Sequence, residues 1–336
     1  MADSILQKNS RKFWQEVKKI NSNKDNLPNT VDSSTGKVPI ANLFKEKYDN
    51  LYNSVSYNET DMLRLLSDID YKIDSVCCKD KCYHSHCCTV DIVTKCISNL
   101  NHGKMDGNKG HSTDHLIHGT RKLNTYLSLL FTSMLTHAAT PYDMLLSTII
   151  PIPKNKRKSL NDSENYRGIA LSSSICKLFD WILLISNKCI LGSSDLQFGY
   201  KESHSTSHCT FVLEEVINYY NDHNTDVHVV LLDASKAFDR VNYIKLFNLL
   251  LHKGLCPLVA RFLARLYTRQ IVRVKWNDYV TDIFNVSNGV KQGGVLSPIL
   301  FSIYIDELLE KLKTSGYSCH ISNVFLGALA YADDVT

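Results

Sequence analysis

Two short apolar runs that lead into aspartates constrain the fold of this chain more than any other feature. Val229 to Leu232 is followed directly by Asp233, and Ala328 to Tyr331 is followed, one residue later, by Asp333 and Asp334. Such runs predict buried strands, and a carboxylate at the end of a buried strand is costly unless it is paired or binds a metal. We therefore expect the two strands to lie side by side, so that their aspartates converge.

Converging carboxylates repel one another, and a cation between them relieves that repulsion. Mg²⁺ is the expected cation because it is hard and prefers oxygen ligands, and Mn²⁺ can replace it. Two such ions about 4 Å apart can clamp the attacking and leaving oxygens of an in-line phosphoryl transfer. The alternative is that each aspartate only starts a turn, as Asp often does. Three aspartates with these apolar leads favour the two-metal site.

The composition is that of an ordinary globular protein, with 336 residues of which 44% are apolar and 21% charged. The formal net charge is only +4, so bulk charge alone does not indicate a nucleic-acid binder. We expect no membrane segment and no secretory signal, because no apolar stretch reaches about 18 residues and the start lacks an apolar core. The 11 cysteines follow no framework, which indicates free thiols in a reducing, intracellular compartment, the nucleus or the cytoplasm.

The chain divides by sequence character into three parts. Residues 1–39 are polar and turn-rich, residues 40–145 carry mainly helical spacing, and from residue 146 short β-branched runs alternate with helical segments. This pattern predicts helices followed by a mixed α/β domain over residues 146–336. Within the helical part, the spacing predicts a buried stripe made of Tyr126, Leu127, Leu130, Phe131 and Leu135.

A dense cluster of thiols and imidazoles lies between Cys77 and Cys88, with the sequence CCKDKCYHSHCC. Thiolate and imidazole are the ligands that zinc prefers. The spacing fits no closed four-ligand template, however, and no second cysteine pair follows. A surface loop with thiols that bind no metal is therefore the favoured interpretation, and a zinc site is the alternative.

Three longer motifs resemble, in order and spacing, the central motifs of reverse transcriptases. They are Asp233-Ala-Ser-Lys-Ala-Phe-Asp239, Gly289-Val-Lys-Gln-Gly-Gly-Val-Leu-Ser-Pro298 and Tyr331-Ala-Asp-Asp334. Upstream, Ile150-Pro-Ile-Pro-Lys154, Asn165-Tyr-Arg-Gly-Ile-Ala-Leu171 and Gln197-Phe-Gly-Tyr200 resemble further motifs of the same family. The form of the motifs is similar to the enzymes of non-LTR (LINE-type) retrotransposons.

The resemblance implies an α+β right-hand polymerase with fingers and a palm, whose antiparallel palm sheet is backed by helices. Residues 1–39 would be a linker following a missing endonuclease, residues 40–145 a helical N-terminal extension, and residues 146–336 the fingers and a partial palm. Because a thumb follows the palm in this family, we expect a C-terminally truncated fragment with the thumb absent.

The implied activity is RNA-directed DNA synthesis that extends a primer 3′-end with dNTPs, using an RNA template, a DNA primer or target, and two Mg²⁺ ions. Two other functions stay open. A catalytically incompetent remnant of a retrotransposon would bind RNA in a salt-sensitive way without incorporating nucleotides. An RNA-dependent RNA polymerase shares the acidic site, but the bulky Phe238 argues against ribonucleotides.

The resemblance also implies which residues are catalytic. Asp233 and Asp333 would ligate both Mg²⁺ ions, with Asp334 as an acidic neighbour in the same site. The backbone carbonyl of Ala234 would complete the coordination shell of one ion.

Five further residues are implied to contact substrates. Phe238 stands where the family places its steric gate against a ribose 2′-hydroxyl, although without the family a core aromatic would be the simpler interpretation. Gln292 and Gly293 would lie against the incoming nucleotide and the template. Lys154 and Arg167 would bind the triphosphate, because cations suit phosphate oxygens.

Two positions depart from the family pattern. Lys201 stands where an arginine is frequent, which puts a template or nucleotide contact at this position in doubt. Gly168 stands where a proline is frequent, and it is expected to loosen a turn without abolishing binding.

Overall fold

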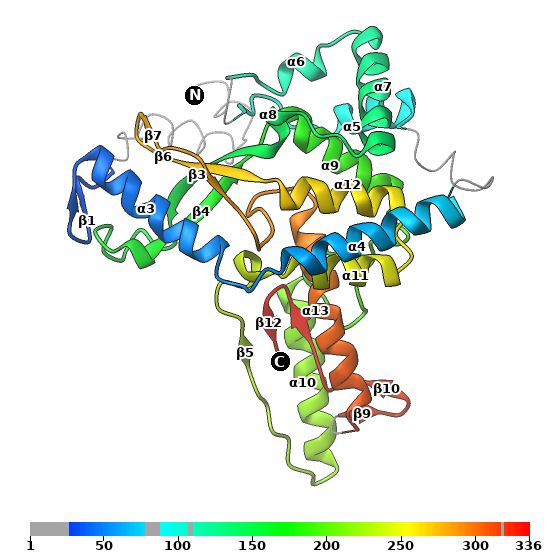
Figure 1. Ribbon diagram of the computed structural model, residues 1–336. Coiled ribbons are helices and arrows are strands. Elements are labelled where there is room, and N and C mark those ends of the chain that lie inside the picture. The colour runs from blue at the N-terminus through cyan, green and yellow to red at the C-terminus, as the bar shows by residue number, and fades with distance from the viewer. Residues whose placement is uncertain (1–26, 78–87, 107–109, 317–318) are drawn as a thin grey trace, which may run out of the picture.

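The computed structural model describes residues 27–77, 88–106, 110–316 and 319–336. It has mixed α and β structure, with a large sheet, a small sheet and several layers of helices (Figure 1). The expected combination of α and β elements is thus confirmed. Among the described residues, no helix is both long and apolar enough to span a bilayer.

The large sheet is built around β3 (Leu146–Pro153), which pairs antiparallel with β4 (Tyr166–Leu171) and parallel with β6 (Ile271–Trp276). Two short strands, β7 (Tyr279–Val280) and β8 (Phe284–Asn285), add to β6. The amphipathic helix α3 (Lys37–Tyr52) covers this sheet. Its Phe44 ring lies 5.1 Å from both the Tyr166 and the Trp276 rings, so residues upstream of 146 share a core with the sheet.

The largest hydrophobic core is helical. It is formed by α4 (Glu59–Lys72), α5 (Val90–Ser98), α7 (Arg121–His137), α9 (Ser174–Ser186), α11 (Tyr243–His252), α12 (Pro257–Thr268) and α13 (Ser297–Thr314). At its centre Phe179 packs against Phe131, at 4.8 Å between ring centroids, and against Phe262, at 5.0 Å. Helices from the predicted N-terminal extension and from the later domain therefore bury one common surface.

The predicted stripe on α7 is correct in its centre and wrong at its flanks. Leu127, Phe131 and Leu135 are buried, but Tyr126 is 69% exposed and Leu130 is also exposed. These two side chains are four residues apart and lie together along one side of the line of buried residues, where α7 faces solvent.

The small sheet contains the aspartates. It has the order β11 (Ala330–Tyr331), β12 (Asp334–Val335), β5 (Leu232–Asp233), with antiparallel pairing throughout. The two apolar runs were expected to be neighbours, but β12 separates them, so that Asp233 lies opposite Asp334 and not beside the strand that leads into Asp333. The hairpin packs on α13 through a cluster of buried residues that includes Leu309, Ala328 and Val335.

The prediction of a buried strand over Val229 to Leu232 is wrong. Only Leu232 joins β5, and Val230 and Leu231 are 64% and 76% exposed. Because β5 lies at the edge of the small sheet and pairs over two residues, nothing among the described residues covers the rest of the run. The run leading into β11 is buried as expected, with Ala328, Leu329 and Ala330 almost inaccessible.

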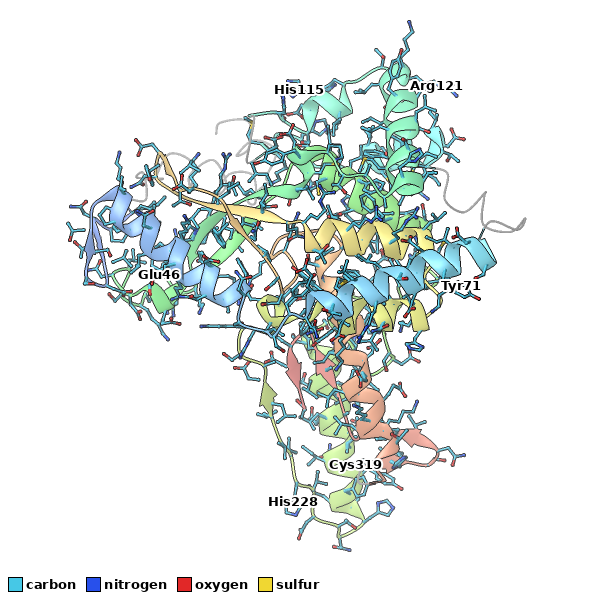
Figure 2. The ribbon with its side chains drawn as sticks, in the orientation of Figure 1. Glu46, Tyr71, His115, Arg121, His228 and Cys319 are labelled. Carbon is cyan, nitrogen blue, oxygen red and sulfur yellow. The ribbon has the colours of Figure 1, made fainter. Side chains whose placement is uncertain are left out.

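Helices α10 (Thr206–Asp222) and α13 extend away from the large sheet toward the small one (Figure 1). Val216 is the buried residue of α10, so this helix is largely solvated. His228, labelled in Figure 2, lies at the start of the extended segment that leads from α10 into β5.

The remaining short elements connect the larger ones. They are β1 (Thr30–Val31), β2 (Ser34–Thr35), the π-turn Ile73–Cys77, α6 (Asp114–Ile117), α8 (Tyr142–Leu145), the 3₁₀ turns Ser163–Asn165 and Ala237–Arg240, β9 (His320–Ile321) and β10 (Val324–Phe325). The interior of the Cys77–Cys88 cluster, residues 78–87, lies outside the described residues. The interpretation of this cluster as a loop stays a prediction.

Candidate active site

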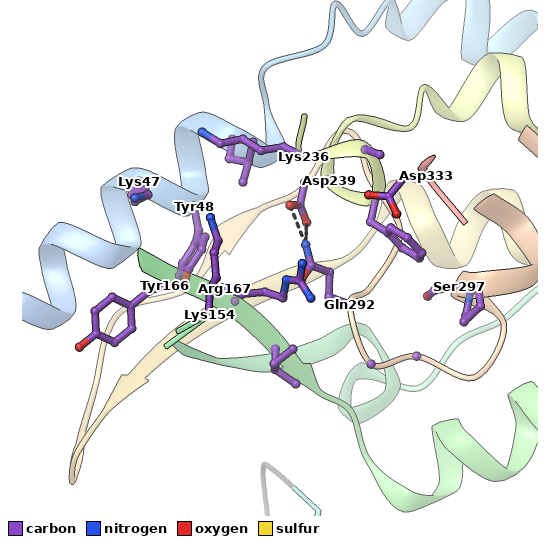
Figure 3. Close-up of a pocket in the computed structure, with 18 of the residues that line it drawn as sticks. Lys47, Tyr48, Lys154, Tyr166, Arg167, Lys236, Asp239, Gln292, Ser297 and Asp333 are labelled. Carbon is purple, nitrogen blue, oxygen red and sulfur yellow. Dashed lines mark hydrogen bonds between the residues drawn. The ribbon is translucent and has the colours of Figure 1, made fainter. Parts of the chain in front are cut away.

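A cavity of about 420 Å³ opens where the large sheet, α3 and the turns of the small sheet meet. Its lining includes six of the residues predicted from sequence or resemblance, namely Lys154, Arg167, Phe238, Gln292, Gly293 and Asp333. Figure 3 shows cationic side chains on one side of this cavity and Asp333 on the other. Segments more than 150 residues apart in the chain therefore contribute to a single pocket.

The cationic side of the cavity comes from the hairpin of β3 and β4. Lys154 directly follows β3, and its backbone N–H donates to the carbonyl of Asn165 at 2.7 Å, which holds the end of the hairpin closed. Arg167 is an exposed residue between buried neighbours in β4, as strand alternation requires. Within the part of the chain that the structure describes, the Arg167 guanidinium has no carboxylate partner, so its charge is available to a ligand.

A third cation comes from α3, and sequence analysis did not predict it. The Lys47 ammonium lies 2.7 Å from the Glu164 carboxylate and donates to the Ser163 hydroxyl at 3.1 Å. The hydrogen bond from Lys47 lowers the pKa of Glu164. Helical spacing alone identifies α3 as amphipathic and gives no signal that Lys47 would reach a cavity formed by residues more than 100 positions away.

The aspartates lie on the opposite side. Asp334 in β12 is the direct register partner of Asp233 in β5, and Asp333 occupies the turn between β11 and β12. Asp333 lines the cavity, whereas Asp233, Ala234 and Asp334 do not. The backbone therefore brings the three aspartates of two distant segments together, with one of them facing the pocket.

These three carboxylates do not form a compact ligand cluster in the described residues. The group of three metal-capable side chains with all ligand atoms within 4.8 Å of one another is a different one, formed by His102, Asp114 and His118. None of its members lines the cavity. The Asp114 carboxylate, at the start of α6, accepts from the Ser112 hydroxyl and the Gly103 N–H and lies 2.9 Å from His102 Nδ1.

Phe238 lines the cavity together with the cations and Asp333. Its ring stacks on Phe301 of α13, with centroids 4.5 Å apart and an angle of 18° between planes. The Tyr200 ring meets it edge-on at 6.1 Å. Phe238 is only partly buried and lines the cavity, so it is both a core contact and a surface against which a ligand can rest.

Gln292 is fixed by Asp239, a residue for which the sequence pattern predicted no role of its own. The Gln292 amide nitrogen donates to both carboxylate oxygens of Asp239, at 2.7 Å each. Burial raises the pKa of Asp239 to about 6, although the hydrogen bond from Gln292 and the Arg167 charge oppose this rise. Asp239 is the last residue of the motif that begins at Asp233, and its position in that motif was the available signal.

Backbone conformation around the cavity is unusual at several positions. Tyr200, Lys236 and Ala332 all have left-handed φ angles, of 61°, 56° and 61°. Residues with a β-carbon adopt this region at a cost, and such strain concentrates at functional sites. Gly293 has a φ of 99°, which a glycine adopts without that cost.

The two departures from the family pattern have structural explanations. Lys201 lies outside the cavity, and its ammonium donates to the Ser194 carbonyl at 2.7 Å. Gly168 does not lie in a turn, so the expectation that it loosens one is wrong. Gly168 lies within β4 and is the register partner of Pro151 in β3. A β-carbon at Gly168 would lie 2.9 Å from the Tyr48 ring of α3.

The mixed α and β fold and this site are those of a polymerase of the fingers-and-palm type. Residues 152–336 match the protein family described as reverse transcriptase (RNA-dependent DNA polymerase), which is more than half of the chain. The chain belongs to this reverse transcriptase family.

Its curated relatives come from retrotransposable elements, in agreement with the expected non-LTR group. The Pol polyprotein of the type-1 element R2 from Popillia japonica is 29% identical over 59% of this chain and 28% of its own length. A probable RNA-directed DNA polymerase from transposon BS of Drosophila melanogaster is 30% identical over 62% of this chain and 23% of its own length. The chain thus spans less than a third of these relatives.

A solved structure was also found. It is apo telomerase from Candida tropicalis, truncated from the C-terminal domain. It aligns with 69% of this chain and 51% of its own, at a TM-score of 0.42 and 14% sequence identity.

Proposed function

We propose that the chain carries the RNA-directed DNA polymerase core of a non-LTR retrotransposon and extends a primer 3′-end with dNTPs. One observation carries this proposal: a single cavity gathers Lys154, Arg167, Phe238, Gln292 and Asp333 from five separate sequence motifs. Cations on one side and a carboxylate-bearing turn on the other suit a ligand that is anionic at one end and reacts at the other.

The oxygen donors of the palm turns suit divalent metal ions by their chemistry, although their ligand atoms do not form a compact cluster among the described residues. Asp233, Asp333 and Asp334 offer hard carboxylate oxygens on paired strands, and the Ala234 carbonyl directly follows β5. We propose Mg²⁺ as the resident ion, because hard oxygen ligands suit it and Mn²⁺. When bound, such ions lower the pKa of an attacking hydroxyl and neutralise charge on a departing pyrophosphate.

The protein's own side chains would orient the nucleotide. Lys154 and Arg167 would neutralise the triphosphate and hold it in the cavity. Lys47, which also lines the cavity and pairs with the Glu164 carboxylate, would support them. Phe238 would close the space beside the sugar and so select against a 2′-hydroxyl. Fixing substrate and catalytic groups in one geometry supplies a large share of the rate in such reactions.

The proposal implies an RNA template, a DNA primer or target, and action where such nucleic acids occur, in the nucleus or the cytoplasm. The template would approach from the side of Gln292 and Gly293. The exposed basic segment Lys156–Lys158, beside the cavity, would add phosphate contacts that weaken as salt rises.

Primer extension by the purified chain tests the proposal. Asp333→Asn is expected to reduce dNTP incorporation on a primed RNA template to background, because it removes the carboxylate that faces the cavity. The matched control is Asp226→Asn, which changes an exposed aspartate in the loop before β5 and should leave incorporation unchanged. Equal activity of Asp333→Asn and wild type would refute the assignment. Salt-sensitive RNA binding by a wild-type chain that incorporates no nucleotide would favour the non-catalytic remnant.

A further inference from the structure

The turn that presents Asp333 depends on an unfavourable backbone conformation. Ala332, the residue before Asp333, has a φ of 61° and is buried. Alanine rarely adopts this left-handed region, because its β-carbon approaches the neighbouring carbonyl. Something outside the hairpin must therefore hold Ala332 in place, since two-residue strands on either side provide few pairs.

The side chain of Gln197 supplies that support. It is fully buried, and its Oε1 accepts hydrogen bonds from the Ala332 N–H at 2.9 Å and from the Gly199 N–H at 2.8 Å. Its Nε2 donates to the Ala332 carbonyl at 3.1 Å. Both backbone polar groups of the strained residue are thus held by one amide.

The backbone around Gln197 reinforces the same contact. The Ala330 N–H donates to the Leu196 carbonyl at 2.8 Å, and the Phe198 N–H donates to the Ala330 carbonyl at 2.7 Å. A β-carbon at Gly199 would collide with the backbone nitrogen of Ala332. The segment from Leu196 to Gly199 therefore lies against β11 and the turn with no room between them.

We propose that Gln197 is the positioning residue that sets the conformation of the Ala332 turn and thereby aims the Asp333 carboxylate into the cavity. Gln197 does not line the cavity, so it would act only through this turn. A primary amide is required because the site needs a donor and an acceptor on one side chain. The catalytic consequence rests on the proposed function, whereas the control of the turn conformation does not.

The main variant is Gln197→Met, which keeps the length of the side chain and removes both hydrogen-bonding functions. We expect the kcat for dNTP incorporation to fall about a hundredfold, as for a displacement of about 1 Å at a catalytic group. The KM for dNTP should stay within about twofold, because Lys154 and Arg167 lie on a different sheet. Binding of Mn²⁺ alone, followed by electron paramagnetic resonance, should weaken as it does in Asp333→Asn.

A rescue experiment separates positioning from a merely structural role. Glycine adopts left-handed φ angles freely, so Ala332→Gly in the Gln197→Met background should recover part of the lost kcat and Mn²⁺ affinity. The matched control is Gln270→Met. Gln270 is also a buried glutamine, but its Nε2 has no partner among the described residues. It directly precedes β6 of the large sheet. This control should leave kcat and Mn²⁺ affinity unchanged.

Amide hydrogen exchange tests the turn itself, independently of catalysis. In the wild-type chain the Ala332 amide should exchange slowly, and Gln197→Met should accelerate its exchange while Gln270→Met should not. Unchanged exchange at Ala332 in Gln197→Met would overturn the inference, as would unchanged kcat and Mn²⁺ affinity in an active enzyme. If Gln197→Met does not fold, Gln197→Glu, which keeps the acceptor and loses the donor, is measured in the same way. If the wild-type chain neither incorporates nucleotides nor binds Mn²⁺, the polymerase proposal is refuted. The role of Gln197 in the turn would still be decided by the exchange result.

Discussion

Replacing Asp239 by asparagine should stabilise the protein at neutral pH although it removes a charge from the candidate active site. Asp239 is 5% exposed and accepts two hydrogen bonds from Gln292. Burial nevertheless raises its pKa from 3.8 to about 6. Folding therefore penalises the charged form of this side chain relative to the unfolded chain, and asparagine, which resembles the neutral form in shape and charge, avoids that penalty.

The size and the pH window follow from that pKa. A rise from 3.8 to about 6 corresponds to about 3 kcal/mol of folding free energy. Because the folded state binds the Asp239 proton more tightly than the unfolded state, this contribution is fully present below the unfolded pKa of 3.8. It is lost as pH rises through the folded pKa of about 6. Asp239→Asn has no such titration, so its advantage over wild type should grow by about 3 kcal/mol between about pH 4 and pH 7.5.

Urea unfolding of both proteins at a series of pH values measures this advantage, since the difference between them cancels the titration of all other groups. A difference that stays flat across the window, or that declines with rising pH, would mean that the Asp239 carboxylate is well solvated or fully compensated, and the reasoning would fail. Activity should move in the opposite direction. The asparagine presents an N–H₂ where Gln292 now meets a second oxygen, so Gln292 should be held less firmly.

Two further predictions concern packing around the cavity. Gly168→Ala should lower the free energy of unfolding by about 1–3 kcal/mol, because its β-carbon would press against the Tyr48 ring. The control Gly192→Ala, with open space around it, should change the free energy of unfolding by less than about 0.5 kcal/mol. Thermal melting compares the two variants, and equal effects would contradict the packing argument. Phe238→Ala should raise incorporation of rNTPs relative to dNTPs, because it enlarges the cavity where the Phe238 ring now lies. Phe301→Leu, which alters the stacking partner of Phe238 outside the cavity, should leave that ratio unchanged. Competition assays with both nucleotides measure the ratio, and an unaltered ratio in Phe238→Ala would argue for a purely structural ring.

The aspartate-bearing segments illustrate how far local sequence pattern reaches. Both runs were predicted as buried strands lying side by side, but β12 lies between them, and Asp233 meets Asp334 of β12 instead. Burial was right for Ala328, Leu329 and Ala330, partly right for Tyr331 and wrong for Val229 to Leu232. Apolar content alone cannot distinguish a central strand from an edge strand, since burial depends on which neighbours the fold supplies.

Helices gave the same mixture of success and error. On α7 the predicted Leu127 is buried but Tyr126 is exposed, and on α13 Leu308 is 39% exposed whereas the next residue, Leu309, is in the core. A shift of one position on a helix turns a side chain by about 100°, and only the packed neighbours decide which of two adjacent leucines faces inward.

The sequence by itself determined the chemistry: which carboxylates, cations, aromatic and glycine residues the chain offers, in which order, and hence the family to which it belongs. Tertiary structure alone decided that Lys47 of α3 reaches the cavity, that Asp239 holds Gln292, and that Gln197 holds the turn before Asp333. The physical reason is that side-chain identity is a local property. Burial, hydrogen-bond partners and pKa are set by groups that lie more than 50 residues away in the chain and that come together only when it folds.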